Sequence, residues 1–160
     1  MLPPEFLNRM EKLLGAEYPE FLAAYDRPLQ KGIRLSQRKV CRKLPKFLGA
    51  PIPWAKGGYT YDPMERPGKH PYHEAGLYYL QEPSAMAPAT LLAPRPGERV
   101  LDLCAAPGGK STQLGDMLAG EGLLVANEIN PKRAKILSRN SRYLRSPQRN
   151  PAGLQSHCRW

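Results

Sequence analysis

One short run of mostly small residues stands out as able to hold a ligand close to the backbone. Its members are, in order, Cys104, Ala105, Ala106, Pro107, Gly108, Gly109 and Lys110. The apolar stretch 99–103 before this run predicts a strand, and residues 110–118 after it predict a helix. Small side chains let a backbone approach a ligand, and the first N–H groups of a helix have no partner within it. Ligands bind at such carboxyl ends of strands in open α/β sheets.

A nucleoside-triphosphate loop is the first alternative for this run. Its pattern is Gly-x-x-x-x-Gly-Lys-Ser/Thr, and Gly109-Lys110-Ser111 matches its end. The first glycine of that pattern would have to stand at position 104, which is Cys104. The dinucleotide pattern Gly-x-Gly-x-x-Gly is also absent. The sequence therefore argues against both phosphate-binding loops.

A carboxylate, Glu128, follows the next apolar stretch, residues 122–126. An acidic residue at the end of the second strand binds ribose hydroxyls in Rossmann-like sites. The alternative is a surface carboxylate that pairs with Lys132. The 104–110 loop that precedes it favours ribose binding.

The elements that must position these residues form a repeating pattern. Strand, loop, helix and strand make a βαβ unit, which implies a parallel pair with a right-handed crossover, and Pro131 opens a further helix through Leu137. Upstream, we expect helices within 3–25, a loop-rich stretch over 50–72, a strand ending near Leu80 and a helix entered at Pro83.

A second candidate site is a long basic stretch. The formal net charge is +10, and between Asp26 and Asp62 there are nine Lys or Arg residues and no acid. Cations beside aromatics such as Trp54 and Tyr59 suit RNA, because phosphates need charge and bases need flat stacking partners. The alternative is a solvated face with ordinary core aromatics. The candidate RNA-binding residues are Lys31, Arg34, Arg38, Lys39, Arg42 and Lys43.

Composition excludes several classes. The three cysteines, Cys41, Cys104 and Cys158, are far apart, which argues against a disulfide framework and a zinc site. The N-terminus mixes charges into its apolar pattern and is not a signal peptide. No apolar run approaches the roughly 20 residues that span a bilayer. We expect a cytoplasmic monomer that binds no metal and no membrane.

The 104–110 loop with Asp102 and Leu103 resembles the first motif of the Sun-type (Nop2/Sun/Fmu) RNA cytosine-5 methyltransferases. Gln81 to Met86 resembles that family's run before the catalytic domain, and Asn127-Glu128 with Pro131-Lys132-Arg133 resembles its second motif. The similarity is greatest to the bacterial branch that acts on 16S ribosomal RNA.

The resemblance implies an α/β fold: a small N-terminal domain followed by the start of a Rossmann-like, S-adenosylmethionine-dependent methyltransferase sheet. It implies that residues 104–110 line the methionine and adenosine side of this cofactor and that Glu128 holds its ribose. The run from Gly32 to Val40 lies where the family contacts RNA, so ribosomal RNA is the expected partner.

The family's reaction needs a cysteine thiolate that attacks carbon 6 of cytosine, which makes carbon 5 nucleophilic. The family keeps its functional cysteines in Pro-Cys and Thr-Cys pairs, and this sequence has neither. We therefore expect a methyltransferase by family that is truncated and inactive. A non-catalytic RNA-binding fragment and an unfolded remnant are the alternatives.

The expected division is an RNA-contacting domain at 1–93, an incomplete methyltransferase domain at 94–138 and a disordered tail at 139–160. The tail holds five arginines and no Asp, Glu or Lys. The resemblance to the family stops near Ser138, as a frameshift or truncation would produce.

Overall fold

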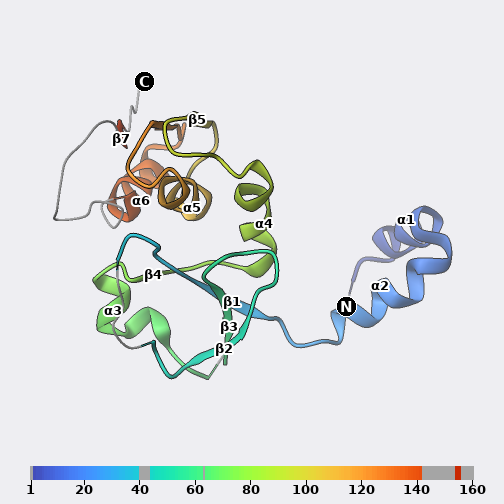
Figure 1. Ribbon diagram of the computed structural model, residues 1–160. Helices are drawn as coiled ribbons and strands as arrows, with labels where there is room; N and C mark the ends of the chain where they lie inside the picture. The colour runs from blue at the N-terminus through green and yellow to red at the C-terminus, as the bar shows by residue number, and fades with distance from the viewer. Residues whose placement is uncertain (1, 40–43, 63, 142–153, 156–160) are drawn as a thin grey trace.

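The computed structural model describes residues 2–39, 44–62, 64–141 and 154–155. A pair of helices stands apart from a body that contains an antiparallel sheet and, above it in Figure 1, a parallel sheet with its helices. Within the described part of the chain, no helix is both long and apolar enough to cross a membrane.

The N-terminal helices form the separate pair. Helix α1 (Pro4–Leu14) leads through the 3-10 turn η1 (Gly15–Glu17) into α2 (Tyr18–Tyr25), which confirms the helices expected within 3–25. A proline suits the first turn of each helix because its missing N–H has no partner there. The ring of Phe21 contacts Phe6 of α1, which joins the two helices, and Tyr18 and Tyr25 of its own helix.

The antiparallel sheet follows. It contains β1 (Lys31–Leu35), β2 (Leu48–Pro51), β3 (Gly58–Tyr61) and β4 (Tyr78–Leu80) in the order β2-β3-β1-β4. The strand ending at Leu80 is confirmed, whereas the sequence analysis missed the other three. They are short and rich in glycine, and charged or proline residues interrupt their alternation, so they resemble loops.

Short helices connect this sheet to the rest of the body. The turn η2 (Pro67–Lys69) and helix α3 (Pro71–Glu74) precede β4, and α4 (Pro83–Leu92) follows it, starting at the proline that predicted its entry. Met86 and Ala89 of α4 are buried, and Trp54 Nε1 donates a hydrogen bond to the Pro83 carbonyl over 2.9 Å. Helix α4 therefore packs between the two sheets.

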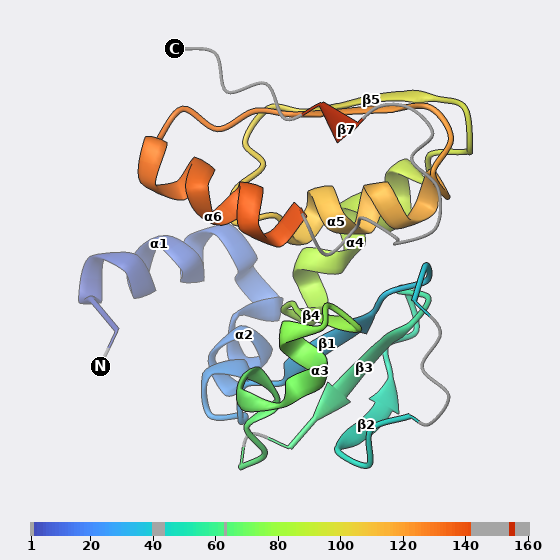
Figure 2. The ribbon, with the colours of Figure 1, turned by 90° about the vertical axis from the view of Figure 1, so that its left-hand side faces the viewer.

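The second sheet is parallel, as predicted. Strand β5 (Arg99–Asp102), helix α5 (Gly109–Met117), strand β6 (Leu123–Ala126) and helix α6 (Pro131–Ser141) follow one another, and Arg99 pairs with Leu123 in register. Val100, Leu114 and Leu124 pack in one buried cluster. Helices α5 and α6 lie on one face of the sheet (Figure 2), while Leu101 of β5 is 59% exposed.

The expected disordered tail is wrong at two places. Helix α6 continues through Arg139 to the buried Ser141, and β7 (Leu154–Gln155) pairs parallel with β6. The end of α6 was difficult to predict because its last buried position is a polar residue, Ser141. The rest of the predicted tail lies outside the described residues.

Candidate cofactor site

The 104–110 loop is fixed to both strands of the βαβ unit. The Ala105 N–H donates to the Asn127 carbonyl over 2.9 Å, and the Asn127 N–H donates to the Asp102 carbonyl over 2.8 Å. The Asn127 side chain also donates to the Leu103 carbonyl over 3.0 Å. These bonds extend the pairing of β5 and β6 into the loop, so the loop starts where both strands end.

Asp102 connects the end of β5 to the first turn of α5. Its carboxylate accepts a hydrogen bond from the Ser111 hydroxyl over 2.7 Å and one from the Cys104 N–H over 3.3 Å. A carboxylate near the N-terminus of a helix is also favoured by the helix dipole. Asp102 therefore joins the start of the loop to the first turn of α5.

The two glycines of the loop are required for different reasons. Gly108 precedes α5 with φ 114°, a conformation that L side chains rarely adopt. Gly109 has ordinary φ, but a Cβ there would lie 3.3 Å from Tyr79 Cε1 of β4. Gly108 thus sets the turn into the helix, and Gly109 allows α5 to approach the antiparallel sheet.

Helix α6 holds the loop from its other side. Arg133 Nη2 donates to the Ala106 carbonyl over 2.6 Å, and Asn140 Nδ2 donates to the Pro107 carbonyl over 2.7 Å. Two consecutive loop carbonyls are therefore bound by one helix. The loop is therefore held from β6, α5 and α6.

Glu128 lies at the end of β6 and is 8% exposed. Its carboxylate accepts a hydrogen bond from the Asn130 N–H over 2.9 Å and lies 3.4 Å from Arg133 Nη1. Glu128 therefore forms its ion pair with Arg133 and not with Lys132, the partner that the alternative predicted. Arg133 contacts both Glu128 and the Ala106 carbonyl, and so links the carboxylate to the loop.

The structure brings all eight predicted cofactor-binding residues to one end of the parallel sheet. Cys104, Pro107 and Lys110 are exposed, whereas Ala105, Ala106 and Gly108 are buried. The exposed members lie beside the N-terminus of α5, whose first N–H groups favour an anion. That these residues bind a cofactor stays a prediction. Among the described residues, no group of three or more His, Cys, Asp or Glu could hold a metal ion.

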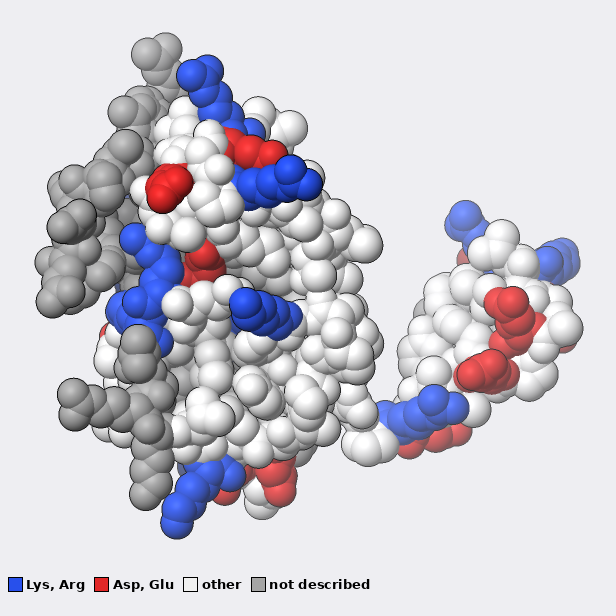
Figure 3. Space-filling view, in the orientation of Figure 1, with Lys and Arg blue, Asp and Glu red and all other residues white. Residues whose placement is uncertain are grey.

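The predicted RNA-binding residues do not form one group. Lys31 is exposed, Arg38 is half-buried beside Gly120, and Lys39 Nζ donates to the Ala75 carbonyl over 2.6 Å. Arg42 and Lys43 lie outside the described residues. On the face shown in Figure 3, basic side chains are interspersed with acidic ones.

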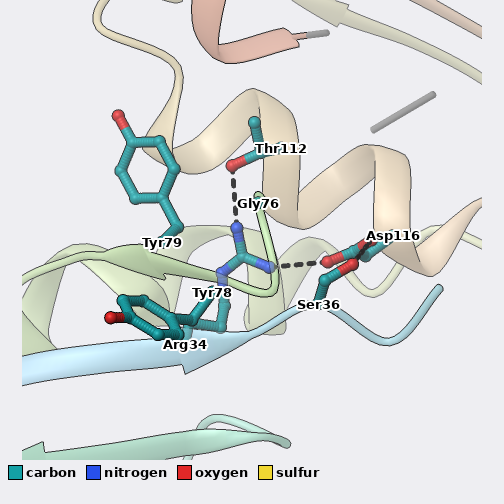
Figure 4. Close-up of a pocket in the computed structure, with 7 residues that line it drawn as sticks. All are labelled: Arg34, Ser36, Gly76, Tyr78, Tyr79, Thr112 and Asp116. Carbon is teal, nitrogen blue, oxygen red and sulfur yellow. Dashed lines mark hydrogen bonds and ion pairs between the residues drawn. The ribbon is translucent and has the colours of Figure 1, made fainter. Parts of the chain in front are cut away.

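Arg34 requires a correction. It is 2% exposed, and its Nη1 lies 2.9 Å from Asp116 Oδ2 (Figure 4), so no phosphate can reach its guanidinium. The prediction that Arg34 contacts RNA is wrong because its side chain is buried between the inner strand β1 and helix α5. Burial lowers the pKa of Arg34 and raises that of Asp116, while the attraction between them opposes both shifts.

Asp116 and the residues around this pair were missed by the sequence analysis. Ser36, Tyr78, Tyr79 and Thr112 line a cavity of about 20 Å³ beside it, room for about one water molecule. Asp116 stands among mostly polar residues and glycines in α5, and no spacing rule connects it to Arg34.

Comparisons with known proteins match most of the chain. Residues 2–83 match the family model described as the N-terminal domain of 16S rRNA methyltransferase RsmF, and residues 89–150 match the model for 16S rRNA methyltransferase RsmB/F. The second match extends to residue 150, past Ser138, where the resemblance to the family was expected to stop.

Two relatives are named ribosomal RNA small subunit methyltransferase F. The protein from Shewanella oneidensis is 41% identical over 152 residues, and that from Vibrio cholerae is 36% identical over 153 residues. Each match covers 87% of this chain and 32% of the relative. The chain thus spans about a third of the length of these relatives.

Solved structures agree on the fold. A methyltransferase homologue from Pyrococcus horikoshii is 28% identical with a TM-score of 0.72, over 89% of this chain and 54% of that one. A second structure, 23% identical with a TM-score of 0.79 over 89% and 34% of the two chains, shares the fold. The predicted class, a small N-terminal domain before the start of a Rossmann-like α/β sheet, is confirmed.

Proposed function

The chain belongs to the 16S ribosomal RNA methyltransferase RsmF family, and from that premise we propose that residues 104–110 and Glu128 bind S-adenosylmethionine. One observation carries the proposal: these residues, distant along the chain, meet at the carboxyl ends of two parallel strands beside the N-terminus of α5. Ligands of open α/β sheets bind at this position.

The residues present fit such a cofactor. The small loop side chains leave the backbone approachable, and the start of α5 favours a carboxylate such as that of the methionine part. The Glu128 side chain is 3% exposed, so a ribose would reach it only after neighbouring side chains move. Its partners are the Asn130 N–H and Arg133, so the carboxylate keeps lone pairs that can accept hydrogen bonds from ribose hydroxyls. Bound S-adenosylmethionine would supply the methyl group.

Arg133 has a supporting part in this proposal. Its guanidinium lies between Glu128 and the Ala106 carbonyl, so it holds the carboxylate beside the loop. It also fixes the loop at a set distance from that carboxylate. A bound ribose would meet a carboxylate already oriented, and less ordering would accompany binding.

For the reaction of the family's full-length members, we propose methylation of carbon 5 of a cytosine in ribosomal RNA, in the cytoplasm of a bacterium. This chemistry needs a cysteine nucleophile. Val40, Leu103 and His157 precede the three cysteines, so none stands in a Pro-Cys or Thr-Cys pair. We propose no catalytic role for any of them, and expect the chain as given to transfer no methyl group to RNA.

An NMR titration tests the cofactor proposal. S-adenosylmethionine added to the isotope-labelled chain should shift the amide signals of residues 104–110 and 128. The loop and Glu128 supply only part of a binding site. The Kd should therefore be above micromolar, which corresponds to a binding free energy smaller than about 8 kcal/mol. Shifts confined to other residues would oppose the proposal, whereas micromolar binding would contradict only the expectation that the site is incomplete.

Two variants separate Glu128 from a general charge effect. Glu128→Gln should weaken binding about tenfold, because hydrogen bonds to a charged acceptor contribute roughly 1.5–3 kcal/mol. Glu121→Gln, an exposed residue before β6, removes the same charge and should leave the affinity unchanged. Equal effects of the two substitutions would show that Glu128 makes no specific contact.

An RNA methylation assay tests the second part. The purified chain with labelled S-adenosylmethionine and ribosomal RNA should give background incorporation. Label in cytosine would contradict the conclusion that the chain lacks a cysteine nucleophile for this reaction. The alternative function, RNA binding without catalysis, is favoured by the exposed cations near β1 and is tested by salt-dependent binding.

A further inference from the structure

The guanidinium of Arg34 lies at the junction between the antiparallel sheet and helix α5. Its Nε donates to Gln81 Oε1 over 3.0 Å, and its Nη1 donates to Asp116 Oδ2 over 2.9 Å. Its Nη2 donates to Thr112 Oγ1 over 2.7 Å and lies 3.4 Å from the Gly109 carbonyl. One side chain from β1 therefore joins Gln81, the residue after β4, to α5.

The partners on α5 follow helical spacing. Gly109, Thr112 and Asp116 lie three and four residues apart, which places them on one face of the helix. Gly109 is the first residue of α5 and directly follows the turn at Gly108. Arg34 thus holds the face of α5 that includes its N-terminus, and Figure 4 shows Thr112 and Asp116 bonded to the guanidinium from that helix.

Gln81 continues the network toward α4. Its Nε2 donates to the Ala85 carbonyl over 2.9 Å and lies 3.3 Å from Gln113 Oε1, while Gln113 Nε2 donates to the Met86 carbonyl over 2.9 Å. Helix α5 is therefore fixed against β1, β4 and α4 by directional bonds. Apolar packing alone would allow the helix to slide or rotate.

Buried ion pairs are weak evidence for stability, because their desolvation offsets much of their attraction. The planar fork of an arginine instead imposes geometry, since it binds several acceptors at fixed angles. A lysine could keep the charge opposite Asp116, but it could not also reach Gln81 and Thr112 in the same arrangement. The type of residue at position 34 is therefore suited to positioning.

We propose that Arg34 is a positioning residue for the 104–110 loop: it fixes the N-terminus of α5 against the N-terminal sheet, and so sets the shape of the loop. The effect of Arg34 on the loop is inferred only from its hydrogen bonds to Gln81, Thr112 and Asp116. The consequence for S-adenosylmethionine binding rests on the function proposed above.

The experiment uses two variants of the full chain and one control. Arg34→Met with Asp116→Leu replaces the buried pair by apolar side chains, an exchange that proteins often accept without loss of stability. Arg34→Lys keeps the charge and loses the fork. Lys31→Met, an exposed residue on the same strand, is the matched control.

The first measurement is amide hydrogen exchange without cofactor. In the double variant, exchange at residues 108–112 should rise about tenfold or more, the effect of losing a charge-assisted hydrogen bond. Exchange at residues 124–126 of β6 should stay unchanged. Arg34→Lys should give an intermediate rise and Lys31→Met none. An unchanged loop, or an equal rise in β6, would overturn the proposal.

The second measurement is the NMR titration with S-adenosylmethionine. Affinity should fall about tenfold in the double variant, with the unfolding midpoint near that of the original chain. If the original chain shows no binding, the proposed function fails, while the exchange data still decide the role of Arg34. If the double variant does not fold, Arg34→Lys decides it by the same exchange comparison.

Discussion

Gly108 determines how the chain turns from the loop into α5. Replacing it with alanine forces a Cβ into a backbone with φ 114° and within 3.3 Å of Leu137 Cδ1. Gly108→Ala should therefore cost about 1–3 kcal/mol of unfolding free energy. Denaturant unfolding measures this loss. Gly68→Ala is the control, because Gly68 has no positive φ and its Cβ would meet Leu80 at 3.4 Å; equal losses would remove the argument.

Tyr78 gives a pH dependence at the scale of one side chain. Burial raises its pKa from 10.0 to about 12, and its hydroxyl donates to the Pro67 carbonyl over 2.7 Å. The unfolded chain loses this proton first. The contribution of Tyr78 to stability is therefore complete below pH 10 and is lost as the pH rises toward about 12.

Tyr78→Phe should make the alkaline fall in unfolding free energy shallower, at a cost of about 1 kcal/mol at neutral pH from the lost hydrogen bond. Unfolding measured across this pH range provides the check. The control is Tyr72→Phe at an exposed tyrosine, which should leave the alkaline decrease in unfolding free energy unchanged. An alkaline fall that Tyr78→Phe does not change would show that Tyr78 is not its source.

Single residues also show which features of the site could be predicted from the sequence and which could not. Glu128 was found because its place after a strand carries a chemical meaning. Arg34 was misassigned because a count of charges does not say which face of a strand each one occupies. Lys31 lies on the same strand and is exposed. Only the pairing of β1 with β3 and β4 shows that Arg34 is buried and Lys31 is not.

At the scale of elements, the helical pair α1–α2 should unfold independently of the sheets. Neither helix has a buried residue, and the ring of Phe21 in α2 contacts Phe6 in α1 and Tyr18 and Tyr25 within its own helix. Phe21→Ala should remove amide protection in residues 4–25 and leave protection in β1 and β6 unchanged. Loss of protection in both sheets would show that the pair supports the body.

The βαβ unit was predictable because each part has a local signal. Apolar stretches predicted β5 and β6, small residues predicted the turn, and a proline predicted the start of α6. Strands β1 to β3 had no such signal, since their pairing joins residues far apart and Gly32 packs tightly against Gln81. Long-range pairing, rather than propensity, makes those strands.

At the scale of the whole molecule, RNA binding should depend on the exposed and half-exposed cations near β1. Replacing Lys31, Arg38 and Lys39 with serine should weaken binding and reduce its salt dependence, by roughly 0.7–0.9 in the slope for each lost phosphate contact. Binding measured across salt concentrations provides both quantities. The control replaces Arg9, Lys12 and Arg95, which are exposed elsewhere; equal losses would indicate attraction by net charge alone.

The central claim is that residues 104–110 and Glu128 form the S-adenosylmethionine site. The most direct test measures nuclear Overhauser contacts between the bound cofactor and the full chain. We predict contacts from the ribose protons to Glu128 and its neighbours, and from the methionine part to Cys104–Lys110 at the start of α5. Contacts confined to other surfaces, such as the α1–α2 pair, would contradict the claim even if the affinity were as expected.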